Sequence, residues 1–136
     1  MTKSKLEKEI INYWIEGAED DLKTAKSLFT SKRFHHCLFF CHLFIEKILK
    51  ALVVKKTKQH APYGHNLLRL AELTGIKFSE KKLDLFAEIT SFNIEARYND
   101  YKRQFRKKAT RVYTQDYFAK AKEMYLWLKG KLSSRM

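Results

Sequence analysis

The chain has 136 residues, a length that indicates one domain over residues 1–136. Apolar residues make up 45%, charged residues make up 32%, and the net charge is +13, which is the composition of a folded protein and not of a disordered one. Only four Gly and one Pro are present, and because sheets need many turns that use these residues, the composition favours a few long helices. The longest apolar stretch, Cys37 to Ile45, contains His42 and falls far short of the ~20 residues that span a bilayer, so we expect no membrane association.

Two long helices are predicted in the first half of the chain. Apolar residues three and four apart predict a helix over about 6–30 and, after a short turn, a second helix over about 33–56. The second segment is apolar on nearly all faces, because Phe39, Phe40 and Phe44 lie off its main stripe. Such a helix is expected to be central or to lie at a subunit interface.

Two further helices are expected after a loop over residues 55–64, which holds the single Pro. Asn66 or His65 is placed to cap a short helix that ends at Gly75. Ser79 is placed to cap the helix that follows.

The apolar stripe of that next helix turns polar toward its end. Asn93 and Arg97 continue the helical spacing set by Phe86 and Ile89. A polar pair at the end of a core-facing stripe often lines a pocket, so both are candidate binding residues. The alternative is that the helix frays here and both side chains face water.

A strongly basic stretch comes next. Residues 102–111 contain six Lys or Arg and no carboxylate. Weak periodicity predicts a loop or irregular turn here, after which Thr114 is the expected cap of a final helix through Leu132. The predicted fold is therefore all-α, a four- to five-helix up-and-down bundle.

This basic stretch is also the strongest functional signal in the sequence. Lys102, Arg103 and Arg106 are candidate phosphate ligands, and the interleaved aromatic residues suit stacking on unpaired bases. Nucleotides, RNA and an acidic protein partner would all be attracted by the same charge. The alternative is a solvated loop whose aromatic side chains fold back onto the core.

The two cysteines are expected to be reduced core thiols. Cys37 and Cys41 share a helical face, as metal ligands can, but His36 and His42 lie off that face. Free cysteine is a common core residue, so we predict neither a metal nor a cofactor. The N-terminal residues lack the apolar core of a signal peptide, and a cytoplasmic protein is expected.

Four short motifs follow one another along the chain. They are Ala18-Glu19-Asp20-Asp21-Leu22 with Ala25, then Glu46-Lys47-Ile48-Leu49-Lys50-Ala51-Leu52, then His65-Asn66-Leu67 with Leu70, and finally Glu95-Ala96-Arg97-Tyr98-Asn99-Asp100. In this order and spacing they resemble the HEPN domain, named for nucleotide binding in higher eukaryotes and prokaryotes. The resemblance covers about residues 8–132.

The resemblance implies a helical bundle that forms a homodimer on its long helices. It also implies a cytoplasmic prokaryotic protein encoded beside a small nucleotidyltransferase as a toxin–antitoxin pair. Arg97 and Tyr98 match the family's Arg-Tyr position, where Arg can bind phosphate and Tyr can stack on a base. The alternative is that Arg97 pairs with Glu46 and joins two helices. We expect structural pairing for Glu46 and a capping role for His65.

The chain departs from the family's ribonuclease motif, in which an Arg is followed a few residues later by a His. No His occurs after His65, and Arg33 stands too close to His35 and His36. Without that His, the usual metal-independent acid–base pair for cleavage at a 2′-hydroxyl is missing. We therefore predict a non-catalytic domain that binds nucleotide or RNA phosphates, or the helical partner of a nucleotidyltransferase.

Two alternatives stay open at this point. One is an endoribonuclease toxin with a non-standard, metal-independent active site, in which Arg97 stabilises the phosphate and Tyr98, His65 or Asp100 moves protons. The other is a purely structural adaptor that binds neither nucleotide nor RNA.

Overall fold

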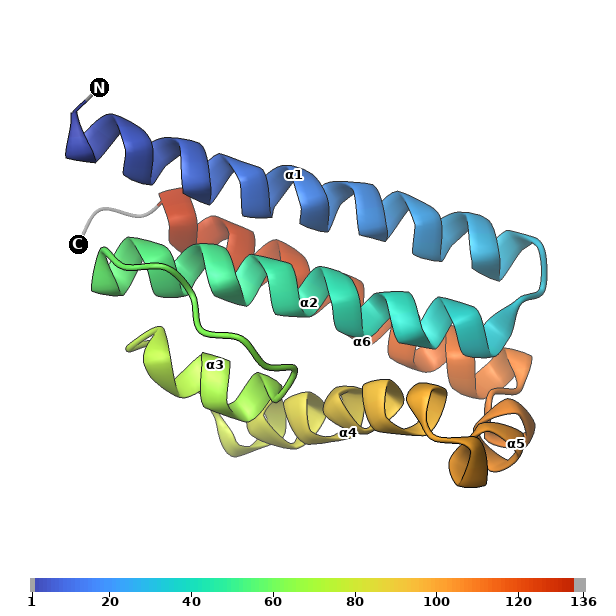
Figure 1. Cartoon of the computed structure of the whole chain (residues 1–136). Helices are drawn as coiled ribbons and strands as arrows, with labels where there is room; N and C mark the ends of the chain where they lie inside the picture. Colours follow the sequence, from blue (N-terminus) through green and yellow to red (C-terminus); the bar gives the residue numbers. More distant parts are fainter. Residues whose placement is uncertain (1, 134–136) are drawn as a thin grey trace.

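A computed structural model describes residues 2–133, and within that range the chain forms six α-helices and no strand (Figure 1). The predicted all-α helical bundle is confirmed. The helices are α1 (Lys3–Thr30), α2 (Phe34–Thr57), α3 (Leu67–Leu73), α4 (Glu80–Arg97), α5 (Asn99–Lys108) and α6 (Arg111–Ser133).

The long helices α1, α2, α4 and α6 alternate in direction along the chain, as an up-and-down bundle does (Figure 1). Helix α2 contacts all five other helices, so the prediction that it is central is confirmed. Helix α5 lies at the same end of the bundle as the turn between α1 and α2. None of the helices within residues 2–133 is both long enough and apolar enough to cross a membrane.

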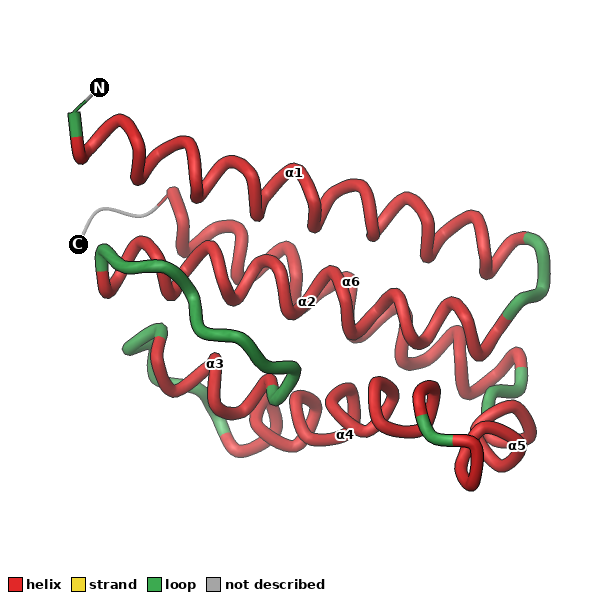
Figure 2. The backbone as a smooth tube through the Cα atoms, in the orientation of Figure 1, coloured by secondary structure: helices red, strands yellow, loops and turns green. Residues whose placement is uncertain are grey.

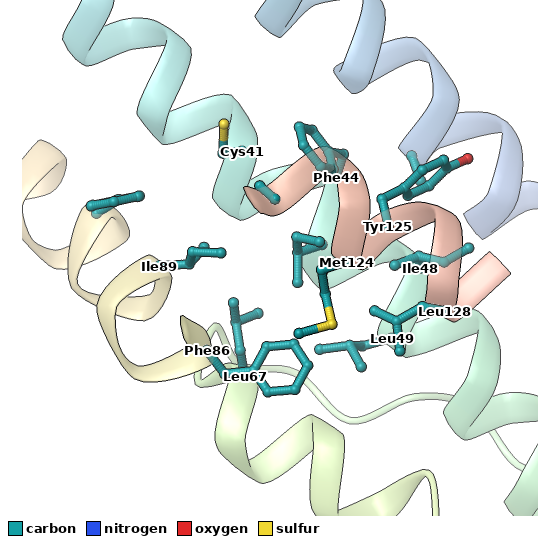
Figure 3. Close-up of a cluster of buried hydrophobic side chains, with 14 of the residues drawn as sticks. Cys41, Phe44, Ile48, Leu49, Leu67, Phe86, Ile89, Met124, Tyr125 and Leu128 are labelled. Atoms are coloured by element: carbon teal, nitrogen blue, oxygen red, sulfur yellow. The ribbon is translucent and has the colours of Figure 1, made fainter. Parts of the chain in front are cut away.

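The core forms where the apolar stripes of α2, α4 and α6 meet (Figure 3). Phe44 on α2 meets the ring of Tyr125 on α6 edge-on, with 5.8 Å between the ring centroids. Full burial of one such large apolar side chain contributes about 1.5–3 kcal/mol. Other fully buried members, several of them labelled in Figure 3, are Ile45, Ile48, Leu49, Leu67, Phe86, Ile89 and Leu128.

The predicted caps of the two middle helices are confirmed. The Asn66 side chain accepts hydrogen bonds from the Leu68 and Arg69 amides at 3.0 and 3.4 Å, and the Ser79 hydroxyl accepts one from the Lys82 amide at 3.2 Å. Gly75 follows α3 with φ +72°, a left-handed conformation that glycine adopts without strain. The loop before α3 is the long green segment of Figure 2.

The prediction of a loop over residues 102–111 is wrong, because α5 covers Asn99–Lys108. The helix buries Phe105 and is otherwise largely exposed, and Tyr101 and Phe105 are its only apolar residues, so its apolar stripe is too short to stand out in the sequence. Its electrostatics favour a helix, because Asp100 lies in the first turn and basic residues lie in the last turn.

The predicted cap of the last helix is also wrong. Helix α6 begins at Arg111, and the Thr110 hydroxyl accepts a hydrogen bond from the Tyr113 amide at 3.2 Å. Thr114 lies inside the helix and is buried. The Arg111 guanidinium lies over the rings of Phe29 and Phe34, 5.9 and 5.6 Å from their centroids. This contact holds the start of α6 against the turn between α1 and α2.

Candidate functional site

A hollow of about 360 Å³ lies where α2, α4 and α5 meet. The first turns of α2, the last turn of α4 and one face of α5 supply its lining. The residues are His35, His36, Phe39, Phe40, Ala96, Arg97, Lys102, Phe105 and Arg106. The hollow thus combines an aromatic lining with three permanent cations, and no carboxylate among residues 2–133 lines it.

The junction between α4 and α5 places these cations together. Only Tyr98 separates the two helices, and its extended backbone, with φ −98° and ψ 126°, turns the chain sharply after Arg97. Lys102 and Arg106 are four residues apart, so both lie on one face of α5. Phe105 is buried beside them and stacks on Phe92 with centroids 5.9 Å apart, which fixes α5 against α4.

Arg97, Lys102 and Arg106 are exposed, so their charged groups can reach a ligand in the hollow. Like charges gathered around one cavity repel one another unless an anion lies between them. Phosphate suits this arrangement, because Arg can bind two of its oxygens at once and Lys adds a point charge.

Two histidines lie beside the cations. The rings of His35 and His36 are 4.0 Å apart, and His35 also meets Phe105 edge-on at 6.3 Å. Burial lowers the pKa of His35, and the charges of His36 and Arg106 lower it further. Burial likewise lowers the pKa of His36, with Arg33 and Arg106 adding to the effect. Both imidazoles are therefore mainly neutral at neutral pH.

A chain of hydrogen bonds runs from the centre of α2 to Arg97 at the edge of the hollow. Lys50 Nζ donates to Glu46 Oε2 at 3.0 Å, and His65 Nδ1 donates to Glu46 Oε1 at 2.8 Å. On its other side, His65 Nε2 accepts from the Arg97 guanidinium at 3.2 Å. The carboxylate can only accept and the guanidinium can only donate, so His65 carries its proton on Nδ1.

Glu46 stays ionised within this network. Burial by itself would raise the pKa of Glu46, but the hydrogen bond from His65, together with His42 and Lys50, lowers it overall. The alternative in which Arg97 pairs directly with Glu46 is not observed, because His65 stands between them. His65 is also not the cap of α3, because Asn66 fills that position.

His42 joins the network from inside the bundle. It is fully buried, and its Nε2 donates to the backbone carbonyl of His65 at 2.7 Å. This bond fastens the loop before α3 to α2. Its Nδ1 lies 3.6 Å from Glu46 Oε1. Burial lowers the pKa of His42, and the Glu46 charge only partly offsets that effect.

The structure separates the predicted binding residues into three groups. Arg97, Lys102 and Arg106 line the hollow together. Tyr98 and Arg103 are exposed next to it but are not part of its lining. Asn93 does not reach it: its side chain is buried, and its Nδ2 has no hydrogen-bond partner among residues 2–133.

Sequence reasoning missed four lining residues on α2, namely His35, His36, Phe39 and Phe40. We considered His36 as a metal ligand with Cys37 and Cys41, rejected His35 and His36 as too close to Arg33 for the ribonuclease motif, and took Phe39 and Phe40 only as apolar surface. The adjacent pair of histidines at the start of a helix was the available signal, but nothing in the linear sequence relates it to Arg97.

The part of the chain that the structure describes contains no group of three or more His, Cys, Asp or Glu side chains placed to hold a metal ion. Cys37 and Cys41 are buried free thiols, and burial raises the pKa of Cys41. The raised pKa keeps the Cys41 thiol protonated, so Cys41 is not an activated nucleophile.

Comparison with known proteins agrees with this architecture. The HEPN domain family model matches residues 11–131. The crystal structure of TT1696 from Thermus thermophilus has a similar fold, with a TM-score of 0.76 over 89% of this chain and 97% of that chain. Its sequence is 18% identical, so the similarity concerns the fold alone. No curated protein matches the chain.

Proposed function

Because the chain belongs to the HEPN domain family, we propose that its basic hollow binds the phosphate groups of nucleotides or RNA without cleaving them. The observation that carries the proposal is the convergence of Arg97, Lys102 and Arg106 on one hollow that no carboxylate of the described residues lines. Three exposed cations from two helices match the charge of a nucleotide or of adjacent RNA phosphates.

The fixed orientation of Arg97 supports the same proposal. His65 holds one side of the guanidinium, and Glu46 holds His65. An arginine held in this way loses little side-chain freedom when it binds phosphate, so more of the binding energy is retained.

The direct test is equilibrium binding of ATP and of a short single-stranded RNA at several salt concentrations. For RNA, the logarithm of the affinity should fall with the logarithm of salt, with a slope of about −0.7 for each phosphate bound. Replacing Lys102, Arg103 and Arg106 by Glu should abolish binding of both ligands. Unchanged affinity in that variant would favour a structural adaptor instead.

The matched control replaces Lys3, Lys5 and Lys8 by Glu. These lysines are exposed at the start of α1, at the opposite end of the bundle from α5 (Figure 1). The control changes the net charge by the same amount, so it separates a local site from a general effect of charge. We expect it to keep most of the affinity.

The proposal extends to partners. The homodimer, the cytoplasmic location and a nucleotidyltransferase partner in a toxin–antitoxin pair are all properties that the family resemblance implies. Analytical ultracentrifugation of the purified chain tests the dimer. Co-purification with a small nucleotidyltransferase encoded next to it tests the pair, and separate elution of the two proteins would count against that part.

A second candidate function is RNA cleavage, and one observation favours it. His35 and His36 lie in the same hollow as Arg97, although the family's usual His is missing. One neutral imidazole can accept the 2′-hydroxyl proton as that oxygen attacks phosphorus. A protonated one can donate to the 5′-oxygen as the P–O5′ bond breaks. His65 suits this role less, because both of its ring nitrogens are already hydrogen-bonded.

Cleavage is tested by incubating the purified protein with end-labelled RNA in the presence of a chelator. If the protein binds RNA without cleaving it, the labelled RNA stays intact. Cleavage that disappears in Arg97→Ala and in His35→Gln would replace it with the ribonuclease function. Cleavage that persists in both variants would indicate a contaminating nuclease.

A further inference from the structure

The lining of the hollow is mostly aromatic, which phosphate binding alone does not explain. Phe39 and Phe40 are half-buried, and Phe105 and the His35 ring complete one apolar wall. Phosphate is strongly hydrated and gains nothing from contact with these rings. The wall therefore suits a second, flat and apolar part of the same ligand.

Size and position indicate what that part is. At about 360 Å³, the hollow lies at the small end of the range of ligand pockets. Arg97, Lys102 and Arg106 line the same hollow as the aromatic wall. A nucleobase joined to its phosphate has this combination of an aromatic face and an adjacent anion.

We propose that the hollow receives one unpaired base of an RNA strand, while the cations that line it hold the phosphates on either side of that base. This inference rests on the proposed function. A base within a duplex is stacked on both faces and cannot enter the hollow. The site is therefore selective for single-stranded RNA over duplex RNA.

The cations outside the hollow argue for a strand over a free nucleotide. Arg33, exposed in the turn before α2, and Arg106, on α5, both lower the pKa of His36, which lines the hollow, so cations from two elements lie near this histidine. Arg103 and Lys107 extend it along the exposed surface of α5. Successive phosphates of a strand can contact more of these cations at once than the phosphate of one nucleotide can.

Two exposed tyrosines near the hollow support the same ligand. Tyr98 is 60% exposed and Tyr101 is 51% exposed, and both lie at the junction of α4 and α5. Tyrosine rings exposed beside a basic surface can stack on the bases that flank the bound one.

The experiment compares four ligands by fluorescence: a short RNA with 2-aminopurine at one central position, the same RNA in a duplex, the same strand with an abasic central site, and AMP. We expect the single strand to bind about tenfold more tightly than the abasic strand, because one stacked base is lost. The 2-aminopurine emission should fall on binding. Duplex RNA and AMP should both bind more weakly than the single strand.

Phe39→Leu tests the stacking contact most directly, because it keeps an apolar side chain but removes the aromatic ring. Phe40 is less suitable since it also packs against the buried core. Phe39→Leu should bind the single strand about tenfold more weakly and the abasic strand as before. Tyr13→Leu is the matched control: Tyr13 is 68% exposed on α1 and does not line the hollow, so its loss should change neither affinity. Circular dichroism of both variants checks that they fold.

Three results would overturn the inference. Equal affinity for the intact and abasic strands would leave phosphate binding in place but remove the base from the hollow. Tighter binding of duplex RNA would contradict an unpaired base. A loss of dimerisation in Phe39→Leu, without a change in RNA affinity, would assign the hollow to contact between two copies of the chain. If no RNA strand or nucleotide binds at all, the proposed function itself fails, and this outcome is separate from the other three.

Discussion

Arg97 has two contacts that together define its role. Its side chain lines the hollow, and its guanidinium donates to His65 Nε2 at 3.2 Å. Behind His65 stand Glu46 and then Lys50, both almost fully buried. A charged side chain at the edge of the hollow is therefore oriented by a buried ion pair, which limits where the guanidinium can go.

The first prediction concerns Arg97 itself. Arg97→Ala should weaken RNA binding about tenfold or more, because a charge-assisted hydrogen bond to phosphate contributes about 1.5–3 kcal/mol. Arg97→Lys should recover only part of this, since Lys cannot bind two oxygens at once. Fluorescence anisotropy with a labelled RNA measures the effect. If Arg97→Ala bound RNA normally and only lowered the melting temperature, Arg97 would be structural.

The second prediction concerns pH and the two histidines of the hollow. Burial and neighbouring cations lower the pKa of His35 and His36 below the ordinary 6.5. A bound phosphate would raise both pKa values again, so binding takes up protons and affinity should increase as the pH falls from 7.5 to 5.5. Replacing both histidines by Asn should flatten this profile. The same change at exposed His60, in the loop before α3, is the control and should leave the profile unchanged.

Helix α5 contributes Lys102, Phe105 and Arg106 to the lining of the hollow. It is short, it buries Phe105, and its other side chains are nearly all exposed. Such a helix does not form by itself in water, because nucleation outweighs the few hydrogen bonds it gains. Packing of Phe105 on Phe92, together with the sharp turn at Tyr98, holds it against the bundle. The binding surface therefore depends strongly on the burial of Phe105.

The third prediction tests that dependence. Phe105→Ala should destabilise the protein by about 3–5 kcal/mol, as is usual for loss of a buried phenylalanine, and should weaken RNA binding because α5 is no longer held in place. Urea unfolding and RNA binding are measured on the same sample. Phe105→Leu, which keeps most of the buried area, should retain most of both properties. An unchanged urea midpoint in Phe105→Ala would show that α5 is held by other contacts.

At the scale of the whole molecule, the bundle joins three separate parts of the chain through one polar network, which is buried at Glu46 and exposed at Arg97. His42 and Glu46 belong to α2, His65 belongs to the loop before α3, and Arg97 ends α4. Breaking a buried ion pair by removing one partner typically costs about 3–5 kcal/mol, because the remaining charge stays buried and unpaired. Stability of the fold and orientation of Arg97 therefore depend on the same residues.

The fourth prediction is that the protein loses stability in two steps as the pH falls. Burial lowers the pKa of His42, so the unfolded chain binds a proton more readily, and stability decreases as the pH drops below about 6.5. His35 and His36 contribute in the same direction. The pKa of Glu46 is also lowered, so a further loss follows as the pH passes below about 4.5.

Urea unfolding at pH 7.5, 5.5 and 4 measures both steps. His42→Gln can still donate to the His65 carbonyl but does not titrate, so it should reduce the loss between pH 7.5 and 5.5 and leave the later one. A wild-type protein that is more stable at pH 5.5 than at pH 7.5 would contradict the lowered pKa of His42.

Local signals predicted most of the fold. The spacing of apolar residues located α1, α2 and α4, and the Asn66 and Ser79 caps were correct, because periodicity and capping depend on residues within a few positions. Helix α5 was missed because it is short and carries only two apolar residues, Tyr101 and Phe105, so its apolar stripe was not recognised among the charged residues. Thr114 was misplaced as a cap because α6 starts immediately after the short link at Ala109 and Thr110.

By itself, the sequence determined the helical class, the central place of α2, the family resemblance and the concentration of positive charge near α5, all of which are properties of residues close together in the chain. Only the tertiary structure decided which side chains share the hollow. Along the chain, most of α2, two loops, α3 and α4 lie between His35 and His36 on one side and Arg97 on the other. These residues meet because, in the up-and-down bundle, α4 ends beside the start of α2. Such contacts depend on how helices pack, and helix packing is not encoded in the spacing of any one segment.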